Sequence, residues 1–214
     1  MSNMSDTPDR PDGLSRRGFI KGFGGAVGAA ALGPAVVKGD TLPETAPVKR
    51  NGVTTYPVAG VEVTLTINGE AKPVHLLPSA TLLEVLREKL GYTGSKEVCS
   101  RGACGACTVL IDGRSVNSCL MLAVDSVGKQ ITTIEGLAKN DQLDPVQQAF
   151  IDHDACQCGY CIPGFVVRSR ALLDEHPAAT PAQVREGLSG NICRCAAYVR
   201  IFEAVESASK GGGA

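Results

Sequence analysis

Nine cysteines, gathered into short groups, constrain this chain more than any other feature of its 214 residues. They occur in three groups along the chain, at positions 99, 104, 107 and 119, then 156, 158 and 161, then 193 and 195. A disulfide framework spreads its cysteines so that bridges staple distant loops, whereas cysteines only a few residues apart suit a metal ion or an inorganic cluster. We therefore expect a fold built around metal centres.

Length and charge narrow the possible classes of protein. A chain of 214 residues is long enough for one large domain or two small ones. The net charge is −1, no block of basic residues occurs beyond the N-terminus, and tryptophan is absent. A nucleic-acid surface needs clustered positive charge and often uses aromatic side chains for base stacking, so nucleic acid is not an expected partner.

The first 39 residues form a region of their own. A polar lead-in is followed by an arginine pair and then by a weakly apolar run of Gly, Ala and Val over 22–37. This order is typical of a twin-arginine export signal, whose motif positions are occupied by Arg16, Arg17, Phe19 and Lys21. The alternative, a membrane anchor, needs about 20 apolar residues, and this run is shorter and rich in glycine. We therefore expect export to the periplasm and no stable membrane span.

Strands are expected after a linker. Residues 40–60 carry prolines and polar residues without a period, as a linker does. The sequence VEVTLTI alternates apolar and polar residues, which indicates a half-buried strand over 61–67. Further strands are expected over 72–77, in a hairpin over 108–120, and over 129–136.

One helix is predicted between these strands, over 79–91. Four leucines recur there at helical spacing: Leu82, Leu83, Leu86 and Leu90. Ser79 or Thr81 is available as the N-cap, and Gly91 ends the helix. A hairpin, a helix and then more strands predict a mixed sheet packed on one helix within a domain over 61–136.

Four helices are predicted after Gly136. Apolar residues recur at helical spacing in four segments, 144–153, 163–176, 180–190 and 197–208. We expect these helices to form a small bundle over 137–208, followed by a frayed tail over 209–214. The fold class is therefore α+β.

The first cysteine group has the spacing C-x4-C-x2-C with a fourth cysteine further on, made by Cys99, Cys104, Cys107 and Cys119. This is the plant-type spacing for a [2Fe–2S] cluster. Gly102 and Gly105 allow the backbone to wrap closely around such a cluster and to direct N–H groups at its sulfurs. A structural zinc ion is the alternative, although zinc modules usually pair two C-x2-C knuckles.

The second group combines a C-x2-C pair, Cys158 and Cys161, with a C-x-C pair, Cys193 and Cys195. Each pair precedes a predicted helix, and a helix N-terminus stabilises negative charge. Two helix starts that meet would bring four sulfurs together. A redox-active C-x2-C pair is the alternative, but it requires a thioredoxin-like βαβ unit, which this half does not predict.

Three segments in this order, CSRGACGACTVLIDGRSVNSC, QCGYCIPG and SGNICRC, closely resemble the iron–sulfur subunit of the xanthine dehydrogenase and aldehyde oxidoreductase family of molybdenum hydroxylases. The resemblance covers nearly all of 61–208. With the export signal, the chain is most similar to the small subunit of a periplasmic aldehyde oxidoreductase. The resemblance implies a ferredoxin-like β-grasp domain followed by a four-helix-bundle domain, each with one [2Fe–2S] cluster.

The resemblance also implies roles for individual residues and for partners. The first four cysteines, 99, 104, 107 and 119, would bind the distal cluster, and 158, 161, 193 and 195 the cluster proximal to molybdenum. Gln157 matches a position whose side chain hydrogen-bonds the pterin of the molybdenum cofactor. A large molybdenum subunit would hydroxylate an aldehyde or an aromatic heterocycle, and electrons would pass through this chain to a FAD-binding subunit or a cytochrome.

Some features depart from the family pattern or lie outside it. Val98 stands before the first ligand where glycine is usual, and Ala196 and Ala197 replace Thr-Gly after the last. Cys156 matches no ligand position and is interpreted as a spare thiol. No catalytic triad, carboxylate pair or phosphate loop is present, so we expect an electron-transfer subunit without catalytic residues of its own. The alternatives are a free-standing ferredoxin-like carrier and a zinc-stabilised interaction module.

Overall fold

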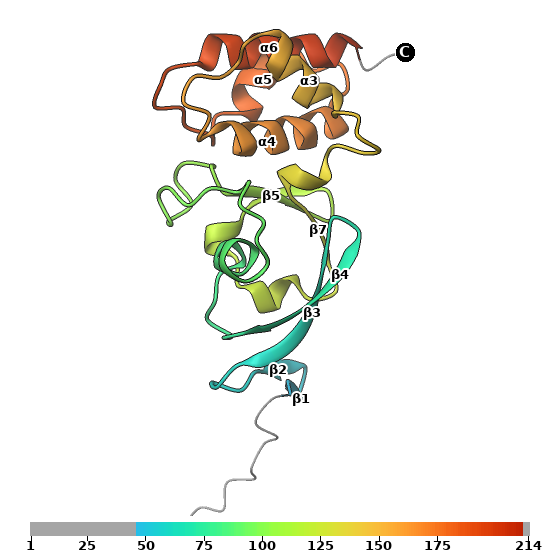
Figure 1. Ribbon diagram of the computed structural model, residues 1–214, viewed down its shortest axis with the longest axis vertical. Helices are drawn as coiled ribbons and strands as arrows, with labels where there is room; N and C mark the ends of the chain where they lie inside the picture. Colours follow the sequence, from blue (N-terminus) through green and yellow to red (C-terminus); the bar gives the residue numbers. More distant parts are fainter. Residues whose placement is uncertain (1–45, 212–214) are drawn as a thin grey trace, which may run out of the picture. The chain divides into compact units, whose positions relative to one another are not determined.

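A five-stranded sheet and four α-helices make up most of the structure, a computed structural model that describes residues 46–211 (Figure 1). All of these residues belong to one compact unit, Leu42–Ala214. The predicted export signal over 1–39 lies outside the described residues. The structure confirms the prediction of a mixed fold of helix and sheet.

The sheet has the strand order β4-β3-β7-β5-β6. Its strands are β3 (Val61–Ile67), β4 (Glu70–Leu76), β5 (Thr108–Ile111), β6 (Arg114–Asn117) and β7 (Gln130–Thr132). β3 and β7 run parallel, and the other neighbours run antiparallel. The strands predicted over 61–67 and 72–77 and the hairpin predicted over 108–120 are therefore present, although β4 begins two residues earlier than expected and residues 118–120 form a 3₁₀ turn. The strand predicted over 129–136 is shorter than expected, because only Gln130–Thr132 forms a strand and Ile134–Gly136 forms a 3₁₀ turn.

Two-residue turns set the register of both hairpins. Asn68 and Gly69 join β3 to β4 with φ angles of 53° and 85°, and Asp112 and Gly113 join β5 to β6 with 49° and 81°. Positive φ at both central residues gives a turn whose twist matches that of the flanking strands. In the first hairpin Ile67 consequently pairs with Glu70, and the buried side chains of β3 face the core.

The predicted helix over 79–91 is present but is mostly a π-helix. A single α-turn, α2 (Leu82–Glu84), passes directly into the π-helix η1 (Val85–Lys89). Thr81 caps the start in a reciprocal capping box with Glu84. Leu82 and Leu86 are fully buried in the core beneath the sheet.

A short hairpin lies inside the segment that the sequence predicts as a linker. It pairs β1 (Val48–Arg50) with β2 (Val53–Thr55) through a turn at Asn51 and Gly52. An Asn-Gly pair is a strong hairpin signal, but the strands here are too short to show an alternating pattern.

Four α-helices follow the sheet, close to the predicted segments, although the last helix continues to Gly211 through residues that were predicted as a frayed tail. They are α3 (Pro145–Asp152), α4 (Ile162–Glu175), α5 (Pro181–Gly187) and α6 (Tyr198–Gly211). They enclose a second hydrophobic core, in which Phe165 and Ile201 are fully buried. Among the helices of residues 46–211, none is both long and apolar enough to cross a bilayer.

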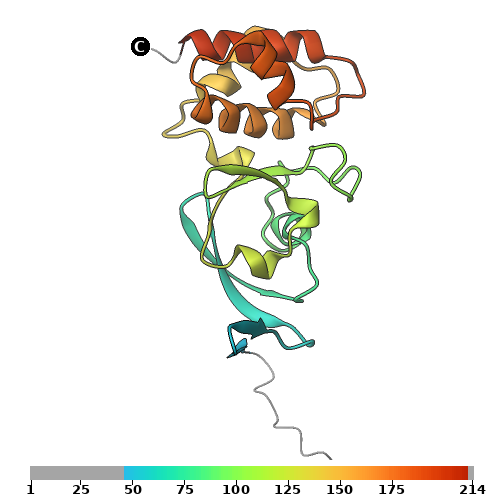
Figure 2. The same ribbon diagram turned by 180° about the vertical axis from the view of Figure 1, so that it is seen from behind.

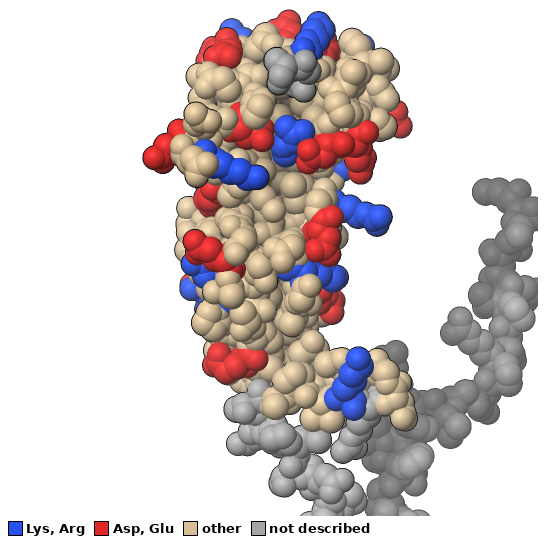
Figure 3. All heavy atoms as spheres, turned by 90° about the vertical axis from the view of Figure 1, so that its right-hand side faces the viewer, with Lys and Arg blue, Asp and Glu red and all other residues tan. Residues whose placement is uncertain are grey.

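The helix α4 joins the helical part to the sheet. It runs beside β5 in both ribbon views (Figures 1 and 2). From α4, the Arg168 guanidinium donates hydrogen bonds to the Ser115 hydroxyl of β6 and, at 2.7 Å, to the Gly187 carbonyl. Figure 3 shows acidic and basic side chains interspersed over one face, as a net charge of −1 suggests.

Candidate metal centres

The first centre lies in the loop over 99–107, directly before β5. The backbone turns sharply there, with positive φ at Ser100, Gly102 and Gly105. The Cys99 and Cys104 thiols come within hydrogen-bond range of each other. The predicted glycine positions therefore have the conformation that a tight sulfur loop requires.

The other two thiols of this group meet from different segments. Cys107 ends the loop, and Cys119 lies in a 3₁₀ turn, Ser118–Leu120, that follows β6. The hairpin of β5 and β6 brings Cys119 next to Cys107, and their thiols are within hydrogen-bond range of each other. The structure thus brings all four predicted thiols to one region in two pairs.

Local hydrogen bonds hold this loop around its sulfurs. The backbone N–H of Gly102 donates to Cys119 Sγ at 3.3 Å. The Ser118 hydroxyl donates to the Cys107 carbonyl at 2.7 Å, and Asn117 Nδ2 donates to the Gly102 carbonyl at 3.0 Å. N–H groups aimed at sulfur stabilise a thiolate and tune the potential of a bound cluster.

The electrostatics of the first group differ between its exposed and buried sides. A hydrogen bond from the Arg101 backbone lowers the pKa of Cys99 to about 7. Burial raises the pKa of Cys107 to about 12. A buried thiol of this kind gives up its proton only when a positive charge compensates for the lost hydration, and a bound metal supplies that charge.

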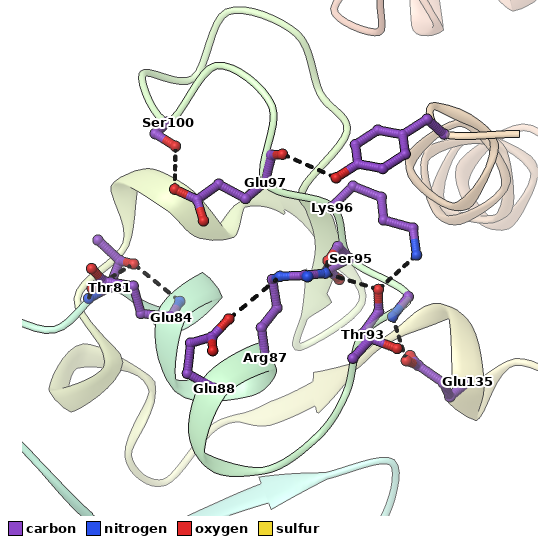
Figure 4. A network of polar contacts seen from close by, with 12 residues as sticks. Thr81, Glu84, Arg87, Glu88, Thr93, Ser95, Lys96, Glu97, Ser100 and Glu135 are labelled. Carbon is purple, nitrogen blue, oxygen red and sulfur yellow. Dashed lines mark hydrogen bonds and ion pairs between the residues drawn. The ribbon is translucent and has the colours of Figure 1, made fainter. Parts of the chain in front are cut away.

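A polar network fixes the chain that leads into the loop (Figure 4). The Arg87 guanidinium donates to the carbonyls of Thr93 and Ser95, at 3.0 Å and 2.8 Å. The backbone N–H of Gly94 donates to Glu135 at 2.7 Å. These contacts join residues 93–95 to the π-helix and to the segment after β7. The backbone that precedes Cys99 is therefore fixed by hydrogen bonds from two elements.

The second centre lies between the starts of α4 and α6. The Cys158 thiol is within hydrogen-bond range of the Cys195 thiol, and the Cys161 thiol of the Cys193 thiol. Cys161 is the N-cap residue of α4, and Cys193 is buried five residues before Tyr198, where α6 begins. The C-x2-C and C-x-C pairs therefore meet, and each thiol contacts a partner from the other pair.

Backbone donors also surround this second group. The Tyr160 backbone N–H lowers the pKa of Cys158. Burial raises the pKa of Cys161 to about 12. The backbone N–H of Ala197 donates to Cys193 Sγ at 3.4 Å. As in the first group, the four cysteines differ in burial: Cys193 is buried and Cys158 is exposed.

The donor chemistry fits a two-iron cluster at each centre. Within residues 46–211, no three His, Cys, Asp or Glu side chains are grouped as the ligands of a single metal ion. The four thiols of each centre instead lie in two contacting pairs. A [2Fe–2S] cluster is held by four cysteines and contains two iron atoms, so each pair of thiols would bind one iron. A structural zinc ion would require four thiolates around one point.

The remaining sequence candidates have distinct positions. Gln157 and Cys156 are both exposed, and Cys156 lines an apolar groove of about 440 Å³ with Phe150 and Pro163. Val98 is exposed and has no positive φ, so its β-branched side chain meets no obstacle. Ala196 adopts a φ of 59°.

Three residues near the centres were missed by the sequence reasoning. Asn191 donates from Nδ2 to the Gly105 carbonyl at 3.0 Å, and Tyr198 accepts a hydrogen bond from the Cys193 backbone at 2.8 Å. The Tyr160 hydroxyl donates to the Glu97 carbonyl at 3.4 Å. Each of these residues is polar and lies within a few positions of a candidate ligand cysteine, and this proximity in the sequence is the signal by which they could have been predicted.

Comparison with known proteins identifies the family. Residues 133–206 match the family described as "[2Fe-2S] binding domain". The chain belongs to the iron–sulfur subunits of the molybdenum hydroxylases, and its role is electron transfer within an oxidoreductase complex.

Individual relatives are similar over different shares of the chain. The aldehyde oxidoreductase iron-sulfur-binding subunit PaoA of Escherichia coli (strain K12) is 41% identical over an alignment that covers 98% of both chains. The nicotinate dehydrogenase small FeS subunit of Eubacterium barkeri is 43% identical over 69% of this chain and 94% of its own. The crystal structure of quinoline 2-oxidoreductase from Pseudomonas putida 86 matches with a TM-score of 0.69 and 40% identity, over 72% of this chain and 96% of that chain.

Proposed function

We propose that this chain is the iron–sulfur subunit of a periplasmic aldehyde oxidoreductase and carries two [2Fe–2S] clusters. The observation that carries the assignment of two clusters is the pairing of thiols two by two at each centre. The end-to-end similarity to an aldehyde oxidoreductase subunit supports an aldehyde over a heterocycle as the substrate of the complex. The two hydrophobic cores support a β-grasp domain followed by a four-helix-bundle domain.

The thiol contacts support a specific set of ligands. In the first centre Cys99 and Cys104 would hold one iron, and Cys107 and Cys119 the other. In the second centre the pairs are Cys158 with Cys195 and Cys161 with Cys193. When bound, each cluster supplies a one-electron carrier. The chain itself holds the thiolates in place, shields the buried ones from water and donates N–H groups to the sulfurs.

The surface near the second centre supports contact with a molybdenum subunit. Cys158 and Gln157 are exposed, so the side chain of Gln157 is free to reach the pterin of a partner's cofactor. Three apolar side chains close in sequence to the ligands are also exposed, namely Tyr160, Ile192 and Val199. A partner that covers them would bury apolar surface and exclude water from the route of the electrons.

The metal content of the purified chain tests the clusters. We expect about four irons per chain, two for each [2Fe–2S] centre, with no zinc and with the visible absorption of iron–sulfur protein. A colourless protein containing zinc would contradict the proposal.

Co-purification tests the role within a complex. If this chain is a subunit of a stable complex, a molybdenum-containing chain should co-purify with it. A FAD-binding chain or a cytochrome, which would accept the electrons, should co-purify as well. A free-standing carrier would instead purify alone with its full iron content, and that result would overturn the assignment to a stable complex.

A further inference from the structure

The loops of the two candidate centres are in direct backbone contact. The backbone N–H of Ile192, next to the ligand Cys193, donates to the carbonyl of Cys104 at 2.9 Å. One residue earlier, Asn191 Nδ2 donates to the carbonyl of Gly105 at 3.0 Å. One hydrogen bond therefore joins the backbone of a first-centre ligand to the residue beside a second-centre ligand, and the Asn191 side chain adds a second link.

The backbone at Gly105 is closely packed on two sides. A Cβ on Gly105 would lie 2.6 Å from Asn191 Nδ2 and 2.7 Å from the Gly190 carbonyl. A Cβ on Gly164, in α4, would overlap the Gly105 carbonyl from another side. Glycine at position 105 therefore allows the second ligand loop to approach this closely, and glycine at position 164 allows α4 to approach the same segment.

Asn191 is anchored at both of its ends. Its backbone N–H donates to the Leu188 carbonyl at 3.0 Å, which fixes it to the end of α5. Its amide is buried and shares the Gly105 carbonyl with the Thr108 hydroxyl, which donates at 2.6 Å. A buried, hydrogen-bonded polar group holds one geometry, because any shift would leave a donor without a partner.

We propose that Asn191 is a positioning residue that sets the separation of the two metal centres. This inference rests on the proposed function, since it requires a cluster in each loop. Electron transfer between clusters slows steeply with distance, and the magnetic interaction between two reduced clusters falls with the inverse cube of their separation. An amide that clamps one ligand loop to the other therefore controls both quantities without touching a cluster.

The chain offers a matched control in Asn117. Its Nδ2 donates to the carbonyl of Gly102, in the same loop and at the same 3.0 Å, but from β6 rather than from the second ligand loop. Asn117→Ala thus removes an equivalent hydrogen bond from the first loop and leaves the link between the loops in place.

The test uses the full-length chain in its complex, fully reduced, with iron analysis and low-temperature electron paramagnetic resonance. We expect Asn191→Ala to retain the iron and both cluster signals but to lose part of the splitting that arises from interaction between the clusters. Asn117→Ala should keep the full splitting. Asn191→Gln adds a methylene that displaces the amide from the Gly105 carbonyl, so it should also reduce the splitting. This variant decides the question if the alanine variant loses iron.

Unchanged splitting in an iron-replete Asn191→Ala or Asn191→Gln variant would overturn the positioning role, as would an equal loss in Asn117→Ala. Each of these outcomes would leave the proposed function standing. Fewer than about four irons in the wild-type chain, two for each centre, would instead overturn the proposed function itself.

Discussion

The hydroxyl of Tyr198 accepts a hydrogen bond from the backbone N–H of Cys193 at 2.8 Å. The ring of Tyr198 packs edge-on against Phe165, with 6.2 Å between the ring centroids. The first turn of α6 therefore contacts Cys193, a candidate ligand of the second centre, through a hydrogen bond and joins the helical core through an apolar contact.

Removal of this hydroxyl should affect the second centre selectively. Tyr198→Phe keeps the ring packing but leaves the Cys193 N–H without its acceptor, so we expect a loss of about 1 kcal/mol in the free energy of unfolding. The spectrum of the second cluster should shift while that of the first stays unchanged. Thermal unfolding and low-temperature electron paramagnetic resonance measure the two effects. Tyr56→Phe, which lies at the other core, is the control; equal shifts in both variants would contradict a specific role.

Replacement of single cysteines should separate ligands from the spare thiol. Cys158 contacts the Cys195 thiol, whereas the Cys156 thiol donates only a weak contact, at 3.6 Å, to the Gln157 carbonyl. We expect Cys158→Ser to abolish the signal of the second cluster and to lower the iron content to about two per chain. Cys156→Ser should change neither quantity. If Cys156→Ser proves to be the damaging change, the assignment of ligands in this segment is wrong.

Ala196 offers a stability test beside the second centre. Its φ of 59° lies in the left-handed region, which costs conformational energy for alanine but not for glycine. Relief of this strain outweighs the greater backbone entropy that glycine loses on folding, so we expect Ala196→Gly to stabilise the chain by about 0.5–1 kcal/mol in chemical denaturation. The neighbouring Ala197 is buried without positive φ, so Ala197→Gly should destabilise. The opposite order of stabilities would show that strain at position 196 is unimportant.

Export provides a test of the N-terminal region. The arginine pair Arg16 and Arg17 is expected to direct the chain to the twin-arginine route. Replacement of both with lysine keeps the charge but removes the motif, so the chain should accumulate in the cytoplasm. Cell fractionation followed by immunoblotting measures its distribution. Periplasmic accumulation of the double variant would contradict the predicted route.

Local sequence signals predicted most of the elements. Alternation identified β3, the Asn-Gly and Asp-Gly pairs are at the turns of the sheet, and Thr81 was available as the cap of the helix after β4. The hairpin over 48–55 was not predicted, because its strands of three residues are too short for a period. The π-helix was also not predicted, because leucines at helical spacing do not distinguish it from an α-helix.

The amino-acid sequence alone predicted the chemistry of the two candidate centres. The spacing of the cysteines indicates which of them are candidate ligands, and the glycines between them indicate where the backbone turns. Both signals lie within segments of a few residues. Only the tertiary structure decided that Cys158 meets Cys195, and that Asn191 reaches Gly105 from 86 residues away. Such contacts depend on how α4 packs against β5, and therefore on two hydrophobic cores that no short motif encodes.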